Sequence, residues 1–466
     1  MLEKYFIAKK KLYPQKVIGK FRNLKSRLNI IFLAIYCFSP FLRFDRENTA
    51  PNQAILIDIV NSKAYFFFIE IWAQEVFYLA GLLILGAVAL FFVTSLFGRV
   101  WCGYACFQTV WTDIFIAVER FFQGDRNDRI LLDRKNNFKK YFLKLLTHLS
   151  WIIISLMTGF FFVSYFNDSI ILLNKLINLQ FAEISLKIYG WIFGIASMTY
   201  IMAGFAREHV CTYMCPYARF QSAMFDDNTL IISYDKKRGE PRQKHKLNES
   251  FENRGHCIDC KQCVVVCPTG IDIRNGLQME CIACGLCIDA CDNIMEKVGL
   301  PKGLIRYDTL AYLNDPIPQK KFRLLQPRTL YYSFILILVS GLMLFSLIKK
   351  PQIETTLIQE RNPLFITLSD GSIRNAYNLK IINKTHQPKN FKIAISRPNF
   401  GILKITNHDE NNIIVPAETA LDFRALISFS PEELAKINPS ETLIEMTIID
   451  LSTQEKMIIS TIFIGE

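Results

Sequence analysis

The sequence predicts a multi-domain membrane protein, in which an α-helical transmembrane bundle of about five spans carries a cysteine-rich module and a C-terminal β-sandwich. The first observation is hydropathy: 51% of the 466 residues are hydrophobic and the mean hydropathy is +0.20, which is too apolar for an ordinary soluble chain. The second is that twelve of the thirteen cysteines are clustered and none follows Cys291. The third is the alternation of apolar and polar residues after Pro351.

The predicted spans are apolar runs with few charges. A helix needs about 20 apolar residues to cross the hydrocarbon core of a bilayer. Five runs meet or approach this length, and they cover approximately residues 29–42, 76–97, 145–166, 186–205 and 330–348. The first run is short and contains Pro40, so an interfacial or re-entrant helix is the alternative there.

The distribution of charge predicts the orientation of these spans. Nine Lys and Arg residues lie within residues 1–28 and nine more within 99–144, whereas the segments 45–74 and 167–185 hold three between them. Because positively charged loops stay in the cytoplasm, this pattern explains the formal charge of +12 without a nucleic-acid partner. The predicted domains are a basic cytoplasmic N-terminus (1–28), four transmembrane helices (29–206) with a cytoplasmic loop (98–144), a cytoplasmic region (207–328), a fifth transmembrane helix (329–349) and an extracytoplasmic domain (350–466).

The first cytoplasmic loop contains a helical pattern over residues 108–122. Its apolar side chains recur at helical spacing at Trp111, Phe115, Val118 and Phe122. A helix along the inner membrane surface and a packed core helix both fit this pattern.

The region 350–466 has strand periodicity. Residues 390–396 and 441–449 alternate between apolar and polar side chains, and Asn, Pro, Gly and Asp turn signals separate such runs. About 116 residues of this kind favour a β-sandwich over a mixed fold, and the region lacks the cysteines of the antibody disulfide. His386 and His408 are interpreted as surface loop residues.

The segment 257–291 contains eight cysteines in a repeated pattern. C-x2-C-x2-C-x3-C-P begins at Cys257, and the same spacing without the proline begins at Cys281. In two-cluster ferredoxins of the bacterial type, three cysteines of each motif hold one [4Fe-4S] cluster and the fourth holds the other. The spacing therefore predicts a ferredoxin module at about 250–300, with one cluster held by Cys257, Cys260, Cys263 and Cys291 and the other by Cys281, Cys284, Cys287 and Cys267. A pair of zinc sites is the alternative, and clusters with a purely structural role are a further one.

Four more cysteines lie at the ends of the second and fourth predicted spans, as Cys102, Cys106, Cys211 and Cys215. Each pair has C-x3-C spacing, which in a helix would place both thiols on one face. Soft thiolate and thioether ligands favour Cu(I), zinc or iron–sulfur clusters, so these four form a candidate copper or redox site, with Met214 and His209 as auxiliary candidates. Small packing residues at the membrane boundary are the alternative.

Several motifs together resemble the CcoG/FixG family of cytochrome c oxidase accessory proteins, which are membrane-bound polyferredoxins. They are the double cluster motif, Gly98-Arg-Val-Trp-Cys-Gly-Tyr-Ala-Cys106, Arg207-Glu-His-Val-Cys-Thr-Tyr-Met-Cys-Pro216, Arg238-Gly-Glu-Pro-Arg242 and Gly303-Leu-Ile-Arg-Tyr307. The resemblance implies an immunoglobulin-like β-sandwich as the C-terminal domain. It also implies a role in assembling cbb(3)-type cytochrome oxidase in the bacterial inner membrane, with reduction of Cu(II) to Cu(I). It departs at Phe107, where the family has proline.

Three functions follow as expectations. The first is a cupric reductase that takes electrons from an unknown donor and passes Cu(I) to a copper chaperone or copper-transporting ATPase serving cytochrome oxidase subunits. The second is a quinol dehydrogenase that resembles the NapH-type membrane ferredoxins. The third is a non-enzymatic assembly scaffold with structural clusters. All three have membrane lipid as a partner.

Overall fold

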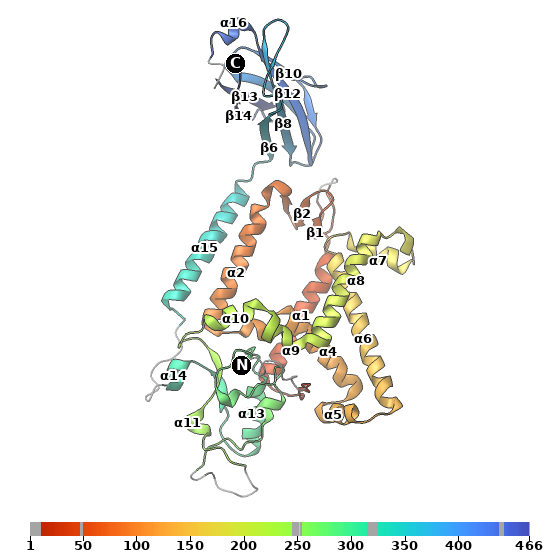
Figure 1. Cartoon of the computed structure of the whole chain (residues 1–466), viewed down its shortest axis with the longest axis vertical. Coiled ribbons are helices and arrows are strands. Elements are labelled where there is room, and N and C mark those ends of the chain that lie inside the picture. The colour runs from red at the N-terminus through yellow and green to blue at the C-terminus, as the bar shows by residue number, and fades with distance from the viewer. Residues whose placement is uncertain are drawn as a thin grey trace. The chain divides into compact units, whose positions relative to one another are not determined.

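The computed structural model describes residues 11–46, 50–244, 251, 254–314, 324–437 and 442–465. The chain divides into two compact units (Figure 1). The first contains the helices and the cysteine-rich module as far as Met343, without residues 45–52; the second contains those residues and the chain from Leu344 onward. Each unit is described separately.

Within the described residues, four helices have the length and composition to cross a membrane: Ala73–Phe97, Phe138–Val163, Leu186–Met214 and Pro327–Ile348. They contain α2 (Phe77–Phe97), α6 (Phe138–Val163), α8 (Leu186–Ile201) with its extension, and α15 (Pro327–Ile348). Most of their apolar side chains are exposed on the protein itself, as expected for surfaces that contact lipid. These helices coincide with four of the five predicted runs.

The helix in the first predicted run is α1 (Lys20–Phe38), followed by a 3-10 turn at Ser39–Phe41. It begins nine residues before the predicted start at residue 29, and it is not among the four helices of spanning length and composition. The early start has a structural cause, because buried Lys25 and Asn29 pair with Asp113 at 3.8 and 3.1 Å. The fifth span remains a prediction.

The first turn of α1 is capped by a residue from far along the chain. The Asp289 carboxylate accepts hydrogen bonds from the backbone N–H groups of Phe21 at 3.1 Å and Arg22 at 2.7 Å. A Cβ atom on Gly19 would collide with the same carboxylate, so glycine is required where the chain passes it. The cap ties α1 to α13 (Leu286–Lys297) of the cysteine-rich module.

The loop 98–144 is folded rather than extended. It forms α3 (Val100–Tyr104), α4 (Phe107–Gln123) and α5 (Arg126–Arg134). α4 is a packed helix: Phe115 is fully buried and stacks on Trp151 of α6 with ring centroids 5.1 Å apart, and buried Glu119 pairs with Arg207 at 3.0 Å. The structure therefore favours the core helix among the two interpretations of residues 108–122.

Helices α6 and α8 lie side by side (Figure 1). Gly159 allows their close approach, since a Cβ atom there would collide with the Ile192 carbonyl oxygen. The extension of α8 contains two π-helical segments, Met202–Ala206 and Val210–Met214, on either side of α9 (Arg207–His209).

The two segments with few positive charges, 45–74 and 167–185, both contain regular structure. Residues 45–74 include an antiparallel sheet of β1 (Ile55–Asp58), β2 (Lys63–Phe66) and β3 (Ile69–Trp72), and residues 167–185 include α7 (Ser169–Ile177). Buried Gln53 connects them by donating to the Ser164 carbonyl at 2.8 Å and accepting from the Ser169 N–H at 3.0 Å.

The cysteine-rich module is closed by two strands that bracket it in sequence. β4 (Ile231–Tyr234) pairs antiparallel with β5 (Ile305–Asp308). Ile232 and Ile305, each 2% exposed, belong to the apolar cluster that surrounds the cysteines. The remaining helices are α10 (Pro216–Ala223), α11 (Lys236–Gly239), α12 (Gln262–Val265) and α14 (Leu310–Asn314).

The second unit contains the predicted β-sandwich. One sheet has the order β10-β12-β8-β6 with β7 on β8, and the other has the order β11-β9-β13-β14. Tyr377, Phe391, Phe429 and Met446 are fully buried in its core. The strands are β6 (Ile353–Gln359), β7 (Ile366–Thr367), β8 (Ile373–Asn383), β9 (Lys389–Arg397), β10 (Ile402–Ile405), β11 (Ile413–Val415), β12 (Thr419–Phe429), β13 (Thr442–Asp450) and β14 (Lys456–Phe463), with the short helix α16 (Pro431–Leu434) after β12.

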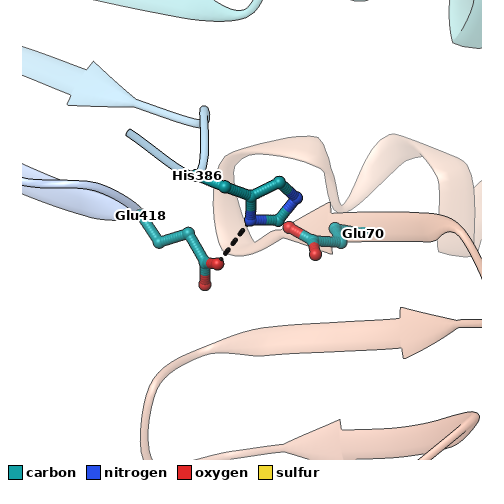
Figure 2. Close-up of side chains that lie close together, drawn as sticks. All are labelled: Glu70, His386 and Glu418. Atoms are coloured by element: carbon teal, nitrogen blue, oxygen red, sulfur yellow. Dashed lines mark hydrogen bonds and ion pairs between the residues drawn. The ribbon is translucent and has the colours of Figure 1, made fainter. Parts of the chain in front are cut away.

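The two histidines of this unit differ from each other. His408 is exposed and its ring packs against Phe423 with centroids 5.0 Å apart. His386 is half-buried, and its Nδ1 lies 2.7 Å from Oε1 of Glu418 (Figure 2). The prediction of His386 as a surface loop residue therefore did not include its contact with Glu418.

Candidate metal centres

Four of the predicted cluster ligands converge on one cavity of the module. Asp259 and Lys261 have left-handed backbone angles, with φ of 50° and 57°, and they curl the chain between successive cysteines of the first motif. The Arg274 guanidinium also lines this cavity and is held by Asp259 at 2.6 Å and Asp272 at 2.7 Å. The cysteines that line it are Cys257, Cys260, Cys263 and Cys291.

A second cavity gathers the other predicted ligands. Ala283 and Gly285, with φ of 52° and 76°, turn the chain around it. Cys263 lines this cavity as well as the first one, so the two lie next to each other. The predicted ligands that line it are Cys267, Cys281, Cys284 and Cys287.

The environment of these cysteines suits metal ligation. Burial raises the pKa of Cys263, Cys281 and Cys291 to about 12, so these thiols lose their protons only to a bound cation. Within the described residues, no three of the cysteines lie within 4.8 Å of one another, whereas the sulfurs of a tetrahedral zinc site are about 3.8 Å apart. This argues against preformed zinc sites.

Cationic side chains lie near both sets of thiols. Arg274 interacts electrostatically with Cys263, Arg99 with Cys281, and Lys25 with Cys284. Positive charge near a cluster favours its reduced, more negative state and raises its reduction potential.

The structure also brings the four membrane-face cysteines together. Cys102 and Cys211 pack in one apolar cluster, and the Cys211 thiol interacts electrostatically with those of Cys102, Cys106 and Cys215. The predicted arrangement of each pair on one helix is wrong, because α3 ends at Tyr104 before Cys106, and the helical segment that contains Cys211 ends at Met214 before Cys215. The second cysteine of each pair instead precedes the next helix, α4 or α10.

Phe107 stands where proline is expected from the family resemblance, and the residue before it, Cys106, still has the backbone conformation that precedes a proline. Cys106 has φ −62° and ψ 127°, close to the φ −78° and ψ 110° of Cys215, which does precede a proline. Both are the extended conformation that proline imposes on the residue before it. Phe107 takes the first helical position of α4, where proline would also fit.

Cys102 has polar contacts that orient its sulfur. Its thiol donates to Oε1 of Gln221 at 3.0 Å, and fully buried Gln221 in turn donates to Thr94 of α2 at 3.1 Å. Burial raises the pKa of the Cys102 thiol, and the Arg99 guanidinium, 3.9 Å from the sulfur, opposes that shift. Arg99 is itself 2% exposed and donates to the Met279 carbonyl of the module.

Helix α3 rests directly on the loop that carries the second set of cluster cysteines. A Cβ atom on Gly103 would lie 2.6 Å from the Ile282 carbonyl oxygen and 3.0 Å from that of Ala283. The Tyr104 hydroxyl donates to the Cys284 carbonyl at 3.0 Å. The membrane-face cysteines therefore contact the module at its second cavity.

The auxiliary copper candidates stand apart from this arrangement. Met214 is 55% exposed, and the His209 ring stacks on Tyr213 with centroids 5.9 Å apart. Neither is part of the apolar cluster that contains Cys102 and Cys211. Sequence reasoning missed the contacts of Arg99, Tyr104 and Gln221. The one signal in the sequence was Gly103, whose position between Cys102 and Cys106 indicates a close approach of another backbone. No pattern in the sequence indicated Gln221.

Comparisons with protein families agree with this architecture. Residues 206–310 match the 4Fe-4S dicluster domain, residues 79–124 match a 4Fe-4S binding domain, and residues 343–466 match the IG-like fold at the C-terminus of FixG. With four apolar helices of spanning length, the chain is an inner-membrane iron–sulfur electron-transfer protein with two [4Fe-4S] clusters.

Three named relatives match most of the chain. Nitrogen fixation protein FixG of Rhizobium meliloti (strain 1021) is 40% identical, covering 83% of this chain and 79% of its own length. In Cereibacter sphaeroides, Protein RdxA is 43% identical (85% and 84% covered) and Protein RdxB is 40% identical (99% and 97% covered). The chain belongs to the CcoG/FixG family. A crystal structure of a FixG-related protein from Vibrio parahaemolyticus is 22% identical and covers 25% of this chain and 98% of its own, with a TM-score of 0.21.

Proposed function

We propose that this protein reduces Cu(II) to Cu(I) at the set of Cys102, Cys106, Cys211 and Cys215, and that it delivers the product for assembly of a cbb(3)-type cytochrome oxidase. The observation that carries the proposal is the packing of α3, which bears Cys102, against the loop 279–284 of the ferredoxin module. A soft thiolate set in contact with an electron-storing module has the parts that a cupric reductase needs.

The residues of the chain have separate roles in this proposal. Two [4Fe-4S] clusters supply one-electron storage and transfer, the first held by Cys257, Cys260, Cys263 and Cys291 and the second by Cys267, Cys281, Cys284 and Cys287. The four membrane-face thiolates bind copper, and each Cu(II) takes one electron. Arg99 offsets the negative charge of the thiolates on one side and holds the module loop on the other.

The rest of the proposal concerns location and partners. The module faces the cytoplasm and the β-sandwich faces the periplasm, as the positive-inside rule requires for five spans. Cu(I) then passes to a copper chaperone or a copper-transporting ATPase, and the β-sandwich is available to oxidase subunits. Membrane lipid surrounds the spanning helices.

The test uses two variants of the full-length protein, one with Cys102 replaced by serine and one with Cys211 replaced by serine. Copper reduction by dithionite-reduced protein should be lost, while the iron content stays at about eight per chain. Wild-type rates in both variants would exclude the four-cysteine set from the reaction. Cys37→Ser is the control, because it replaces a free cysteine and keeps all four cysteines of the set.

The alternative to copper as the ligand of the four-cysteine set is an iron–sulfur cluster. The match to a 4Fe-4S binding domain includes Cys102 and Cys106, and four cysteine thiolates are the ligand set of a [4Fe-4S] cluster. Iron analysis separates the two occupants. About twelve irons per chain indicate a third cluster, and about eight leave the set for copper.

A further inference from the structure

The helical unit contains an apolar cavity beside the membrane-face cysteines. Its volume is about 420 Å³, within the range of pockets for small organic ligands. Helices α1, α4, α6 and α8 supply its walls, and aromatic and aliphatic side chains dominate them. Trp101 and Ala105, the immediate neighbours of Cys102 and Cys106 in the chain, also line it.

The mouth of the cavity suits a ligand that arrives through lipid. Trp101, Phe107 and Met198 line it and are 44%, 69% and 51% exposed. Two of its walls, α6 and α8, are helices with the length and composition to span a membrane. Exposed apolar side chains at the rim of such a cavity favour an amphipathic molecule dissolved in the bilayer.

The few polar groups of the cavity offer hydrogen-bond acceptors. The Gln108 amide nitrogen donates to the Met202 carbonyl at 2.9 Å, which leaves its Oε1 without a hydrogen-bond partner among the described residues. The Tyr36 hydroxyl donates to the Thr158 carbonyl at 2.8 Å and keeps its own lone pairs. Two acceptors in an aromatic cavity match the two hydroxyl groups of a quinol.

Gln108 also lines a second, polar cavity on the other side of its side chain. That cavity contains Cys211, Asp113 and Glu208. Asp113 is paired with Arg22 at 2.7 Å and with Lys25, whereas the Glu208 carboxylate forms no ion pair or hydrogen bond with the residues that the structure describes. Gln108 thus separates an apolar site from a polar one that can accept protons.

We propose that the cavity between α1, α3, α4, α6 and α8 binds a membrane quinol. This quinol is the electron donor for the copper reduction proposed above, so the inference rests on that proposed function. Quinol loses two electrons and two protons to become quinone. The electrons reduce two Cu(II) ions to Cu(I), and the protons leave through the polar cavity. The adjacent module holds two clusters, each of which stores one electron. A quinol, which gives up two electrons, can therefore supply Cu(II), which accepts one electron.

Binding is tested by photolabelling full-length protein in lipid nanodiscs with an azidoquinone, followed by mapping of the labelled peptides. Labelling should fall on the segments that contain Trp101, Phe107 and Met198. Met198→Trp fills the cavity and should abolish this labelling. Met157→Trp is the matched control, because Met157 of α6 is equally exposed at 51% and does not line the cavity.

Electron donation is tested by mixing copper-free, anaerobic protein with menadiol while cluster absorbance is recorded. Met198→Trp should slow cluster reduction about tenfold or more, with iron content and reduction by dithionite unchanged. Labelling spread over the lipid-facing helices, or equal reduction of the Met198→Trp and wild-type proteins, would overturn the proposal.

The two proposals fail in different ways. Clusters reduced by menadiol but inert to Cu(II) would remove the copper reaction and leave the quinol site intact. Clusters that dithionite reduces and Cu(II) reoxidises, but that menadiol leaves oxidised, would remove the quinol site and leave the copper reaction intact.

Discussion

Replacement of Gly103 by alanine tests the contact between the membrane-face cysteines and the ferredoxin module. The new methyl group would lie 2.6 Å from the Ile282 carbonyl oxygen, which would have to retreat by 0.8 Å to restore an ordinary 3.4 Å contact. That oxygen belongs to the backbone between two predicted cluster ligands and cannot rotate away. Overpacking of this kind costs about 1–3 kcal/mol, a shift of about 5- to 150-fold in the docking equilibrium of the loop.

Hydrogen exchange of residues 279–284 in the full-length protein measures the docking, and stopped-flow mixing of reduced protein with Cu(II) measures its consequence. Gly103→Ala should exchange faster in this loop and reduce copper more slowly, with unchanged iron content. Gly86→Ala on α2 is the matched control, because a Cβ atom there has nothing within 4 Å. Exchange and copper reduction as fast as in the wild type would refute the contact.

Three further results are expected. Cys102→Ser should abolish copper binding measured by equilibrium dialysis without changing the iron content, and retained binding would place copper elsewhere. Cys267→Ser should remove the cluster of the second cavity while the electron paramagnetic resonance signal of the first persists; loss of the first alone would contradict the crossed assignment. In the β-sandwich, buried Asp450 pairs with Lys389 at 2.5 Å. Burial opposes ionisation there, but hydrogen bonds from Lys389 and neighbouring hydroxyl groups hold the pKa of Asp450 below its ordinary value. The stability that this carboxylate contributes is therefore present above about pH 4 and lost as the pH falls further, and Lys389→Met should cost about 3 kcal/mol at neutral pH. Hydrogen exchange of β13 checks this, and equal protection of variant and wild type would exclude the pair as a stabilising contact.

The sequence predicted those features that depend on local pattern. Apolar runs of sufficient length identified four spanning helices, since the requirement for about 20 apolar residues is independent of the partners of each helix. Alternation located β9 and β13 within a residue or two. The cysteine motif encoded which thiols share a cavity, because a cluster constrains its ligands at fixed spacing.

Features that depend on distant partners were missed or wrong. The start of α1 was placed too late, because the burial of Lys25 and Asn29 depends on Asp113, which lies 84 positions after Asn29. C-x3-C spacing suggested one helix for each pair, but nothing in the motif showed that α3 would end at Tyr104. The sheet within residues 45–74 has strands of only four residues each, too short for alternation to distinguish them from a loop.

The cap on α1 has a consequence for the biogenesis of the protein. Asp289, which completes the first turn of α1, is synthesised 268 residues after the Phe21 N–H that it binds, and it lies two positions before the predicted ligand Cys291. Folding of a thiolate-bound module is coupled to its metal. Helix α1 therefore obtains its final cap only after the cofactor has been inserted, and an apoprotein would expose an unfinished helix end to quality-control proteases.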